Sequence, residues 1–419
     1  MEHIVVIDNG SGTCKVGFAG RPAPERVFPN GTAKLKGEST TLVGDELIGS
    51  REVSELALRR PFDKGYLVDW KMEREVWSRA LRTVLKVQPR ECGLVLSEPM
   101  FNFPQLQAVT EQIVFEEFGF QSCYIAPAPL FSLQRGRDLQ PHIDASRTGC
   151  GIVVDAGYSF THIVPFFNGL PVLSGVKRIN VGGKLLTSYL KELISFRHFN
   201  VMDETFLVEA IKEKMCFVSG NVRADLKLAS QPGLRSPHRR EFVLKYGEYK
   251  SYYKELSPAA AAAVFAAGGP PVSVSTTPPP EAAKRLADKV ESQVLPLNNE
   301  RFMVPEVLFN PSDIGLYQAG LAEAVALAVR AVHPALQPLI TENVLLTGGL
   351  ACCPGLLERF EAELRPQLPE ECGLHVFLPR NPDLCAWEGM SQFGASRSYR
   401  AMATTRAQYE EKKARAQGR

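Results

Sequence analysis

The stretch from Ile4 to Gly20, IVVIDNGSGTCKVGFAG, limits the fold of this chain more than any other. Four apolar residues open it, the polar segment Asp8–Gly12 follows, and apolar residues alternate after that. β-Branched residues favour strands, and Asn-Gly is a strong hairpin signal. The stretch therefore predicts two antiparallel strands joined by a short turn.

The predicted turn carries groups that suit a phosphate. Its glycines allow backbone N–H groups to approach an anion closely, Ser11 adds a hydroxyl donor, and Lys15 adds a positive charge. Asp8 could hold a divalent cation, directly or through water. An ordinary surface hairpin is the alternative that this stretch alone leaves open.

A second copy of this pattern begins at residue 150. Residues 150–165, CGIVVDAGYSFTHIVP, again predict strand, Asp-x-Gly turn and strand. Asp155 and Gly157 take the places that Asp8 and Gly10 have in the first copy. Two such hairpins indicate two related domains that face one site, and their turns could clamp the phosphates of a nucleotide from both sides.

A third informative stretch is Asn343–Phe360, NVLLTGGLACCPGLLERF. It predicts a buried strand that ends at Gly348 and Gly349 and a helix after Pro354. Glycines at the carboxyl end of a strand let a flat ring lie against the backbone, and helix N-termini attract phosphates.

Length and composition exclude several classes of protein. A chain of 419 residues indicates two domains or more, and a net charge of +2 gives no reason to expect nucleic-acid binding. Nine cysteines without a Cys-x-x-Cys pair argue against a zinc site and a disulfide framework, and favour reduced thiols in the cytosol or nucleus. We expect no signal peptide before Ile4 and no membrane span.

Three local patterns give further expectations. Pro127-Ala128-Pro129 should stop regular structure. Ser312 or Asp313 should begin a long helix that reaches Val332. The charged end, Thr404–Arg419, should be a solvated helix or tail.

Composition changes after Val218. Within residues 219–298, Ser257–Glu281 is dominated by Ala, Pro, Gly, Ser and Thr. Such composition predicts a poorly ordered, low-complexity insertion.

Several separate motifs resemble the actin superfamily and occur in its order. After the DNGSG turn come VFPN (27–30), VGDE (43–46), THIVP (161–165), IKEK (211–214), NERF-x-VPE (299–306) and TGG (347–349). The resemblance implies an α/β fold of the duplicated, ribonuclease-H type, with two domains around a central nucleotide cleft. The expected domains are residues 1–144 plus 385–419, with a small outer subdomain within about residues 28–68, and residues 145–384 with the insertion.

The resemblance also implies a site for ATP or ADP with Mg²⁺. Its cation would be held through water by Asp8 and Asp155. The nucleotide would contact a larger set of residues, namely Gly10, Ser11, Gly12, Thr13, Lys15, Gly157, Tyr158, Gly182, Lys212, Glu213, Gly348 and Gly349.

Other positions depart from the actin pattern. Ala128 stands where actin has a glutamine that orients the attacking water, and a methyl group cannot do so. Tyr158 and Ser159 stand where the second turn of actin has a small acidic residue and a glycine; Tyr158 could point outward without effect or, if it points into the cleft, would compete with phosphate for space. Near the expected adenine, Cys352 and Cys353 replace larger residues, and Asp383 stands where a lysine is expected. We therefore predict a pseudo-ATPase that has no catalytic residues and requires no cofactor, but that could retain binding of ATP or ADP with Mg²⁺.

Within the superfamily, stretches such as EPMFNF (98–103), LFNPSDIG (308–315) and AWEG (386–389) look most like a nuclear subfamily of actin-related proteins. That subfamily implies a structural subunit of an ATP-dependent chromatin-remodelling complex that exchanges histone 2A for its Z-type variant. The implied partners are the motor subunit and a small HIT-type zinc-finger subunit, with nucleosomes and histones contacted indirectly. The implied location is the nucleus.

Two alternatives remain at this point. An ATP-hydrolysing, filament-forming actin-like protein would share the same hairpins, although the short loop at 31–43 argues against filaments. A sugar kinase or chaperone ATPase also has two such hairpins, but VFPN, VGDE and NERF fit actin better.

Overall fold

The computed structural model describes residues 3–35, 40–49, 56–139, 149–231, 236–243, 248–250 and 294–416. Contacts divide the chain into two compact units. Unit 1 comprises Met1–Ser50, Ala57–Leu185 and Val307–Arg419, and unit 2 comprises Arg51–Leu56 and Leu186–Glu306. The domain boundaries expected from the sequence stay a prediction, because this division groups both large sheets in unit 1.

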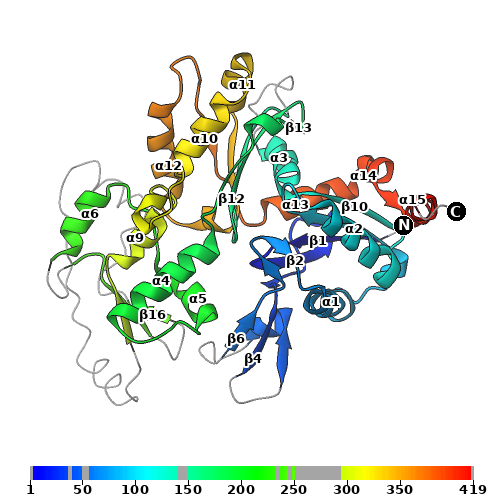
Figure 1. Cartoon of the computed structure of the whole chain (residues 1–419), viewed down its shortest axis with the longest axis horizontal. Helices are drawn as coiled ribbons and strands as arrows, with labels where there is room; N and C mark the ends of the chain where they lie inside the picture. The colour runs from blue at the N-terminus through cyan, green and yellow to red at the C-terminus, as the bar shows by residue number, and fades with distance from the viewer. Residues whose placement is uncertain are drawn as a thin grey trace. The chain divides into compact units, whose positions relative to one another are not determined.

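The first large sheet of unit 1 contains the first predicted hairpin. Its strand order is β20-β10-β9-β1-β2-β3, and β1 and β2 are blue in Figure 1. β1 pairs antiparallel with β2, with Asp8 opposite Lys15, and parallel with β9. The strands are β1 (His3–Asn9), β2 (Thr13–Phe18), β3 (Arg26–Pro29), β9 (Cys92–Glu98), β10 (Ser122–Pro127) and β20 (Thr404–Thr405).

The second large sheet contains the second predicted hairpin and repeats this arrangement. Its order is β13-β12-β11-β18-β19, with β14 also paired to β12. β11 pairs antiparallel with β12 and parallel with β18, as β1 does with β2 and β9. The shared order supports the internal duplication that the sequence predicts. The strands are β11 (Gly151–Ala156), β12 (Thr161–Phe167), β13 (Leu170–Pro171), β14 (Lys177–Ile179), β18 (Val344–Thr347) and β19 (Val376–Phe377).

Three smaller sheets complete the pairing among the described residues. β5-β4-β6 and β7-β8 lie between β3 and the first helix in the sequence, and β16-β15-β17 belongs to unit 2. Their strands are β4 (Thr32–Leu35), β5 (Thr41–Val43), β6 (Leu56–Arg59), β7 (Phe62–Asp63), β8 (Tyr66–Leu67), β15 (Arg240–Val243), β16 (Glu248–Lys250) and β17 (Val294–Leu297).

Helices pack on the large sheets through apolar faces. α1 begins at a cap in which the Asp69 side chain accepts a hydrogen bond from the Met72 N–H, and it buries Val76 and Trp77 completely. The helices of unit 1 are α1 (Trp70–Arg79), α2 (Pro104–Gln112), α3 (Ala128–Leu139), α10 (Leu321–Arg330), α11 (Gln337–Thr341), α12 (Leu356–Leu364), α13 (Cys385–Ala395), α14 (Arg397–Met402) and α15 (Arg406–Ala416). α4 (Gly183–Arg197) begins in unit 1 and continues into unit 2.

Helices α3 and α13 lie side by side, as Figure 1 shows. They approach so closely that a Cβ atom at Gly389 would lie 2.0 Å from the carbonyl oxygen of Phe131. Only glycine permits this distance. Trp387 of α13 is fully buried against the first sheet, where it contacts Gly17 of β2.

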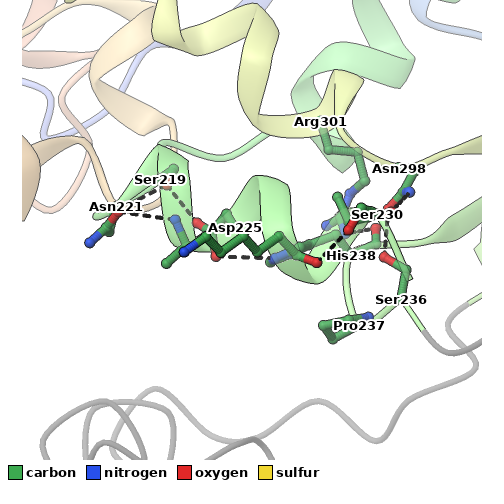
Figure 2. Close-up of polar contacts among 12 residues, drawn as sticks. Ser219, Asn221, Asp225, Ser230, Ser236, Pro237, His238, Asn298 and Arg301 are labelled. Atoms are coloured by element: carbon green, nitrogen blue, oxygen red, sulfur yellow. Dashed lines mark hydrogen bonds and ion pairs between the residues drawn. The ribbon is translucent and has the colours of Figure 1, made fainter.

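Unit 2 combines α5 (Thr205–Met215), α6 (Val222–Ala229) and α9 (Glu300–Glu306) with its three-stranded sheet. Figure 2 shows the polar network around α6. Ser219 donates a hydrogen bond of 2.5 Å to Asp225, and His238 lies 3.1 Å from the other oxygen of that carboxylate. Arg301 donates to the carbonyls of Met215 and His238. The network joins segments far apart in the sequence.

The helices and strands of unit 2 limit the range of residues in which the predicted low-complexity insertion can lie. The segment Ser257–Glu281 falls outside the described residues. Around it, α6 and the three strands β15, β16 and β17 are regular structure that sequence composition did not predict. Their apolar residues Phe242, Leu295 and Leu297 are buried, but each strand is too short to show a clear period.

Two of three local expectations were wrong. Regular structure does not stop at residues 127–129, because β10 ends at Pro127 and α3 begins at Ala128. The helix expected from residue 312 is a single 3₁₀ turn that ends at Gly315, with φ +78°, and α10 begins only at Leu321. The charged C-terminal stretch forms a mostly exposed helix, as expected, although Tyr409 is buried and its ring stacks on Phe115 with centroids 4.8 Å apart.

The remaining global expectations concern cysteines and membranes. All nine cysteines are free thiols, as predicted. None of the helices in the described part of the chain is long and apolar enough to span a bilayer. The described residues also contain no group of three or more His, Cys, Asp or Glu side chains arranged to hold a metal ion.

Candidate functional site

The first turn is built on the buried ion pair between Asp8 and Lys15. Lys15 Nζ lies 2.8 Å from Asp8 Oδ2, and Ser97 Oγ donates to Asp8 Oδ1 at 2.7 Å. Burial alone would lower the pKa of Lys15, but the negative charge of Asp8 and its hydrogen bond raise this pKa above its usual value. Both oxygens of Asp8 therefore already have partners within the protein.

Buried polar side chains also form hydrogen bonds with the first turn. The Asn30 N–H donates to the Gly12 carbonyl at 3.0 Å, and the Asn30 amide donates to the Gly10 carbonyl at 3.1 Å. The same amide lies 3.5 Å from Glu73 Oε1. Burial raises the pKa of Glu73 to about 7, although hydrogen bonds from Asn9, Asn30 and a tryptophan lower this pKa. Sequence reasoning did not single out Asn30 or Glu73.

The second turn is held by the beginning of α4. The N–H of Gly183 donates to the Gly157 carbonyl at 3.1 Å, and the N–H of Lys184 donates to the Tyr158 carbonyl at 2.8 Å. The N-terminus of α4 therefore binds backbone carbonyls of the turn. Asp155 stands at the end of β11, where burial and the negative charge of Asp8 raise its pKa to about 6.

The structure brings the two turns into direct contact. Ser11 Oγ lies 2.8 Å from Ser159 Oγ, although 148 residues separate them in the sequence. Tyr158 covers Gly12, since a Cβ atom at Gly12 would lie 2.8 Å from both Cβ and Cγ of Tyr158. Gly12 itself is buried.

A third segment closes over this contact. The guanidinium of Arg60 lies 4.5 Å from the ring centroid of Tyr158 and donates a hydrogen bond to the Gly12 carbonyl. Gly65, between β7 and β8, has φ +77°, and a Cβ atom there would lie 2.5 Å from the Phe160 ring. We call Ser11, Gly12, Arg60, Gly65, Tyr158, Ser159 and Phe160 the turn junction.

Two of the predicted glycines serve close packing of the second turn. A Cβ atom at Gly182 would lie 2.5 Å from the Tyr158 carbonyl oxygen. Gly348 has φ +94°, and a Cβ atom there would lie 2.4 Å from the Ala156 carbonyl oxygen. Gly349 is exposed and has open space beside it.

The remaining predicted residues are placed as follows. Thr13 is exposed at the start of β2, and its carbonyl oxygen would lie 2.7 Å from a Cβ atom at Gly10. Lys212 and Glu213 lie on α5 of unit 2, where Lys212 is buried and donates to Thr187 at 2.8 Å while Glu213 is exposed. Their role at a nucleotide site stays a prediction.

The positions that depart from the actin pattern lie at element ends. Ala128 is the first residue of α3, directly after β10. Cys352 is exposed near the end of the glycine turn that follows β18, and its thiol is 3.8 Å from the Asp383 carboxylate.

Comparison with known proteins agrees with the repeated sheet and the paired turns. The profile of the family described as Actin matches residues 2–418. The chain belongs to the actin family. Its α/β fold is therefore that of actin, as the motif order predicts.

Similar proteins of the actin family cover nearly the whole chain. Actin-related protein 6 of Oryza sativa subsp. indica is 41% identical over 415 residues, which are 97% of this chain and 96% of that protein. Actin-related protein 6 of Arabidopsis thaliana is 39% identical over 98% of this chain and 97% of that protein. Actin-related protein 6 of Drosophila melanogaster is 35% identical over 97% of both chains.

The contacts between the two turns do not fit the phosphates of the nucleotide that membership of the actin family implies. A polyphosphate between the turns would need the space in which Tyr158 covers Gly12. The hydroxyl of Ser11, the expected phosphate donor, is bonded to Ser159. On the cation side, Asp8 accepts one hydrogen bond at each oxygen, from Lys15 and a serine, and each oxygen keeps a lone pair for a water. Tyr158 and Ser159 thus contact the residues of the first turn to which a phosphate would bind.

Proposed function

We propose that this actin-family protein is a non-catalytic subunit of a nuclear ATP-dependent chromatin-remodelling complex. In that complex it would act as a structural and interaction module during exchange of histone 2A for its Z-type variant. The proposal is supported by near full-length similarity to proteins named actin-related protein 6 and by the sequence motifs shared with that subfamily.

The observation that carries the non-catalytic part is the contact between the two turns. Tyr158 covers Gly12, and Ser11 is bonded to Ser159 across the junction. The cofactor of an actin ATPase would have to separate these groups. We therefore propose that ATP or ADP with Mg²⁺ is not required, and that the chain folds and acts without it.

Ala128 supports the same conclusion by its chemistry. At the beginning of α3 its methyl group can neither donate nor accept a hydrogen bond from an attacking water. Loss of a group that positions the reactant in this way typically lowers a rate by about a hundredfold to ten-thousandfold. Ala128 thus supports the assignment of a pseudo-ATPase.

The proposed partners are the remodeller's motor subunit and a small HIT-type zinc-finger subunit. Contact with nucleosomes and histones would be indirect, and the location would be nuclear, with a cytoplasmic fraction. We propose neither membrane association nor filament formation. The absence of filaments is supported by the shortness of the segment 31–43, since actin has a longer self-association element there.

Two experiments test the proposal. Affinity purification of the full chain from nuclear extract, followed by mass spectrometry, should recover a remodeller motor chain in stoichiometric amounts. Purified protein with Mg-ATP should release no more than one phosphate per molecule and should stay in the supernatant under conditions that pellet actin filaments. Multiple turnovers or filaments would favour the alternative, a cytoskeletal actin-like ATPase.

A further inference from the structure

We propose that Arg60 and Tyr158 form a built-in latch that takes the place of a nucleotide's phosphates and holds the two hairpin turns together without a ligand. The inference rests on the proposed non-catalytic function and adds how the site is kept closed. It concerns residues of unit 1 alone.

The first part of the latch is steric. Both Cβ and Cγ of Tyr158 would lie 2.8 Å from a Cβ atom at Gly12, so that the side chain rests directly on the backbone of the first turn. A bound anion would need close approach to the backbone of this turn. Because Gly12 has no Cβ atom, the Tyr158 side chain has room to pack against it.

The second part of the latch is electrostatic. The planar guanidinium of Arg60 stacks over the Tyr158 ring at 4.5 Å, and it donates to the carbonyl of Gly12. The carbonyls of Ser11 and Asn30 lie 3.5 and 3.4 Å from the same nitrogen. Arginine suits this task because one rigid group can stack on a ring and donate to several acceptors. The cation is therefore held by the carbonyl oxygens of the first turn.

The third part joins the second turn to the segment that carries Arg60. Gly65 has no room for a side chain against the Phe160 ring, and the Arg178 guanidinium lies 4.5 Å from the centroid of the same ring. Arg178 also lies within hydrogen-bonding distance of the Tyr66 hydroxyl, at 3.4 Å. With the bond between Ser11 and Ser159, the turns are joined at several independent points.

The consequence is a site that is closed in the absence of nucleotide and indifferent to its addition. A ligand-gated actin fold would change at these turns when phosphates bind or leave. Here the latch supplies the bridging contacts from within the chain, so the partners of the protein would meet one state of the two turns at any ATP concentration.

The decisive variant is Tyr158→Gly in the full chain, with Tyr158→Phe as the matched control. Steric crowding of this kind corresponds to about 1–3 kcal/mol, so removal of the ring should strengthen binding of Mg-ATP and Mg-ADP by about 5- to 150-fold. The control keeps the ring and should bind as weakly as the wild type. Calorimetric titration and the thermal midpoint at millimolar nucleotide provide the readout. Wild-type binding as tight as that of Tyr158→Gly would overturn the latch.

A measurement on the wild type keeps the proposal testable if Tyr158→Gly does not fold. Hydrogen exchange of peptides that cover residues 9–14 and 156–161 should be slow and unchanged by millimolar Mg-ATP. Arg60→Gln should speed exchange in both peptides, because it removes the stack and the hydrogen bonds to the first turn. Slower exchange of the wild type on nucleotide addition would contradict the latch. Such a result would leave recovery of a motor subunit untouched, so failure of the latch and failure of the proposed function are distinguishable.

Discussion

The buried carboxyl of Glu73 should make the stability of this protein fall as the pH rises through neutrality. Glu73 lies on α1 with none of its surface exposed, and burial raises its pKa from 4.5 to about 7. Because the folded state binds the proton of Glu73 more tightly than the unfolded state does, the contribution of this proton to the free energy of unfolding is complete below pH 4.5. It is lost as the pH rises through 7.

The size of the effect follows from the two pKa values. A pKa raised from 4.5 to about 7, at about 1.36 kcal/mol for each tenfold change in proton affinity, corresponds to about 3 kcal/mol between pH 4.5 and pH 8. Glu73→Gln keeps the shape of the side chain and removes the titration. The difference in unfolding free energy between variant and wild type should therefore change by up to about 3 kcal/mol, in favour of the variant, across this range.

Urea unfolding followed by tryptophan fluorescence gives the assay. Trp77 is fully buried and packs edge-on against Trp70 at 5.8 Å, so emission reports on α1. The midpoint should be measured at pH 5, 6, 7 and 8 for wild type, Glu73→Gln and the control Glu75→Gln, which alters an exposed residue of the same helix. Parallel curves for wild type and Glu73→Gln over this range would refute the reasoning, whatever their offset.

Three further outcomes can be measured with the same unfolding assays. Gly389→Ala should destabilise unit 1 by about 1–3 kcal/mol or more, because the new Cβ atom would lie 2.0 Å from the Phe131 carbonyl oxygen. The control Gly349→Ala places its Cβ atom in open space and should be nearly neutral, so equal thermal midpoints for the two variants would contradict the close packing of α3 and α13. Asn221→Ala removes the side-chain cap of α6 and should cost about 1 kcal/mol in the unfolding of unit 2; an unchanged midpoint would mean that the cap does not stabilise α6. Asp155→Asn should gain stability relative to wild type as the pH rises through 6, because burial and the negative charge of Asp8 raise the pKa of the Asp155 carboxyl to about 6. A difference in unfolding free energy that does not change with pH would contradict the raised pKa of Asp155.

Local sequence patterns predicted the hairpins because their signals lie within a few residues. The apolar run before Asp8 and the Asn-Gly turn specify strand and turn by themselves, and Asp155 and Gly157 repeat them. The Gly348-Gly349 strand end was predicted for the same reason. These features depend on backbone preferences that hold in many tertiary contexts.

Local patterns misled where one residue type serves two purposes. Proline ends strands but also suits the first turn of a helix, so Pro127-Ala128-Pro129 could not distinguish a break from a helix start. The charged C-terminal helix gave no sign that Tyr409 would be buried against Phe115. Burial of one side chain on a polar helix depends on a partner that lies about 300 residues away in the sequence.

By itself the sequence determined which residues turn, which strands pair as hairpins, and that the pattern occurs twice. Only the tertiary structure decided that Arg60 lies over Tyr158 and that Glu73 is shut away from water beneath the first turn. Both outcomes arise from elements that sheet pairing and helix packing bring together over long separations. The physical reason is that a contact or a pKa depends on what surrounds a group in space, and neighbours in sequence record that only in part.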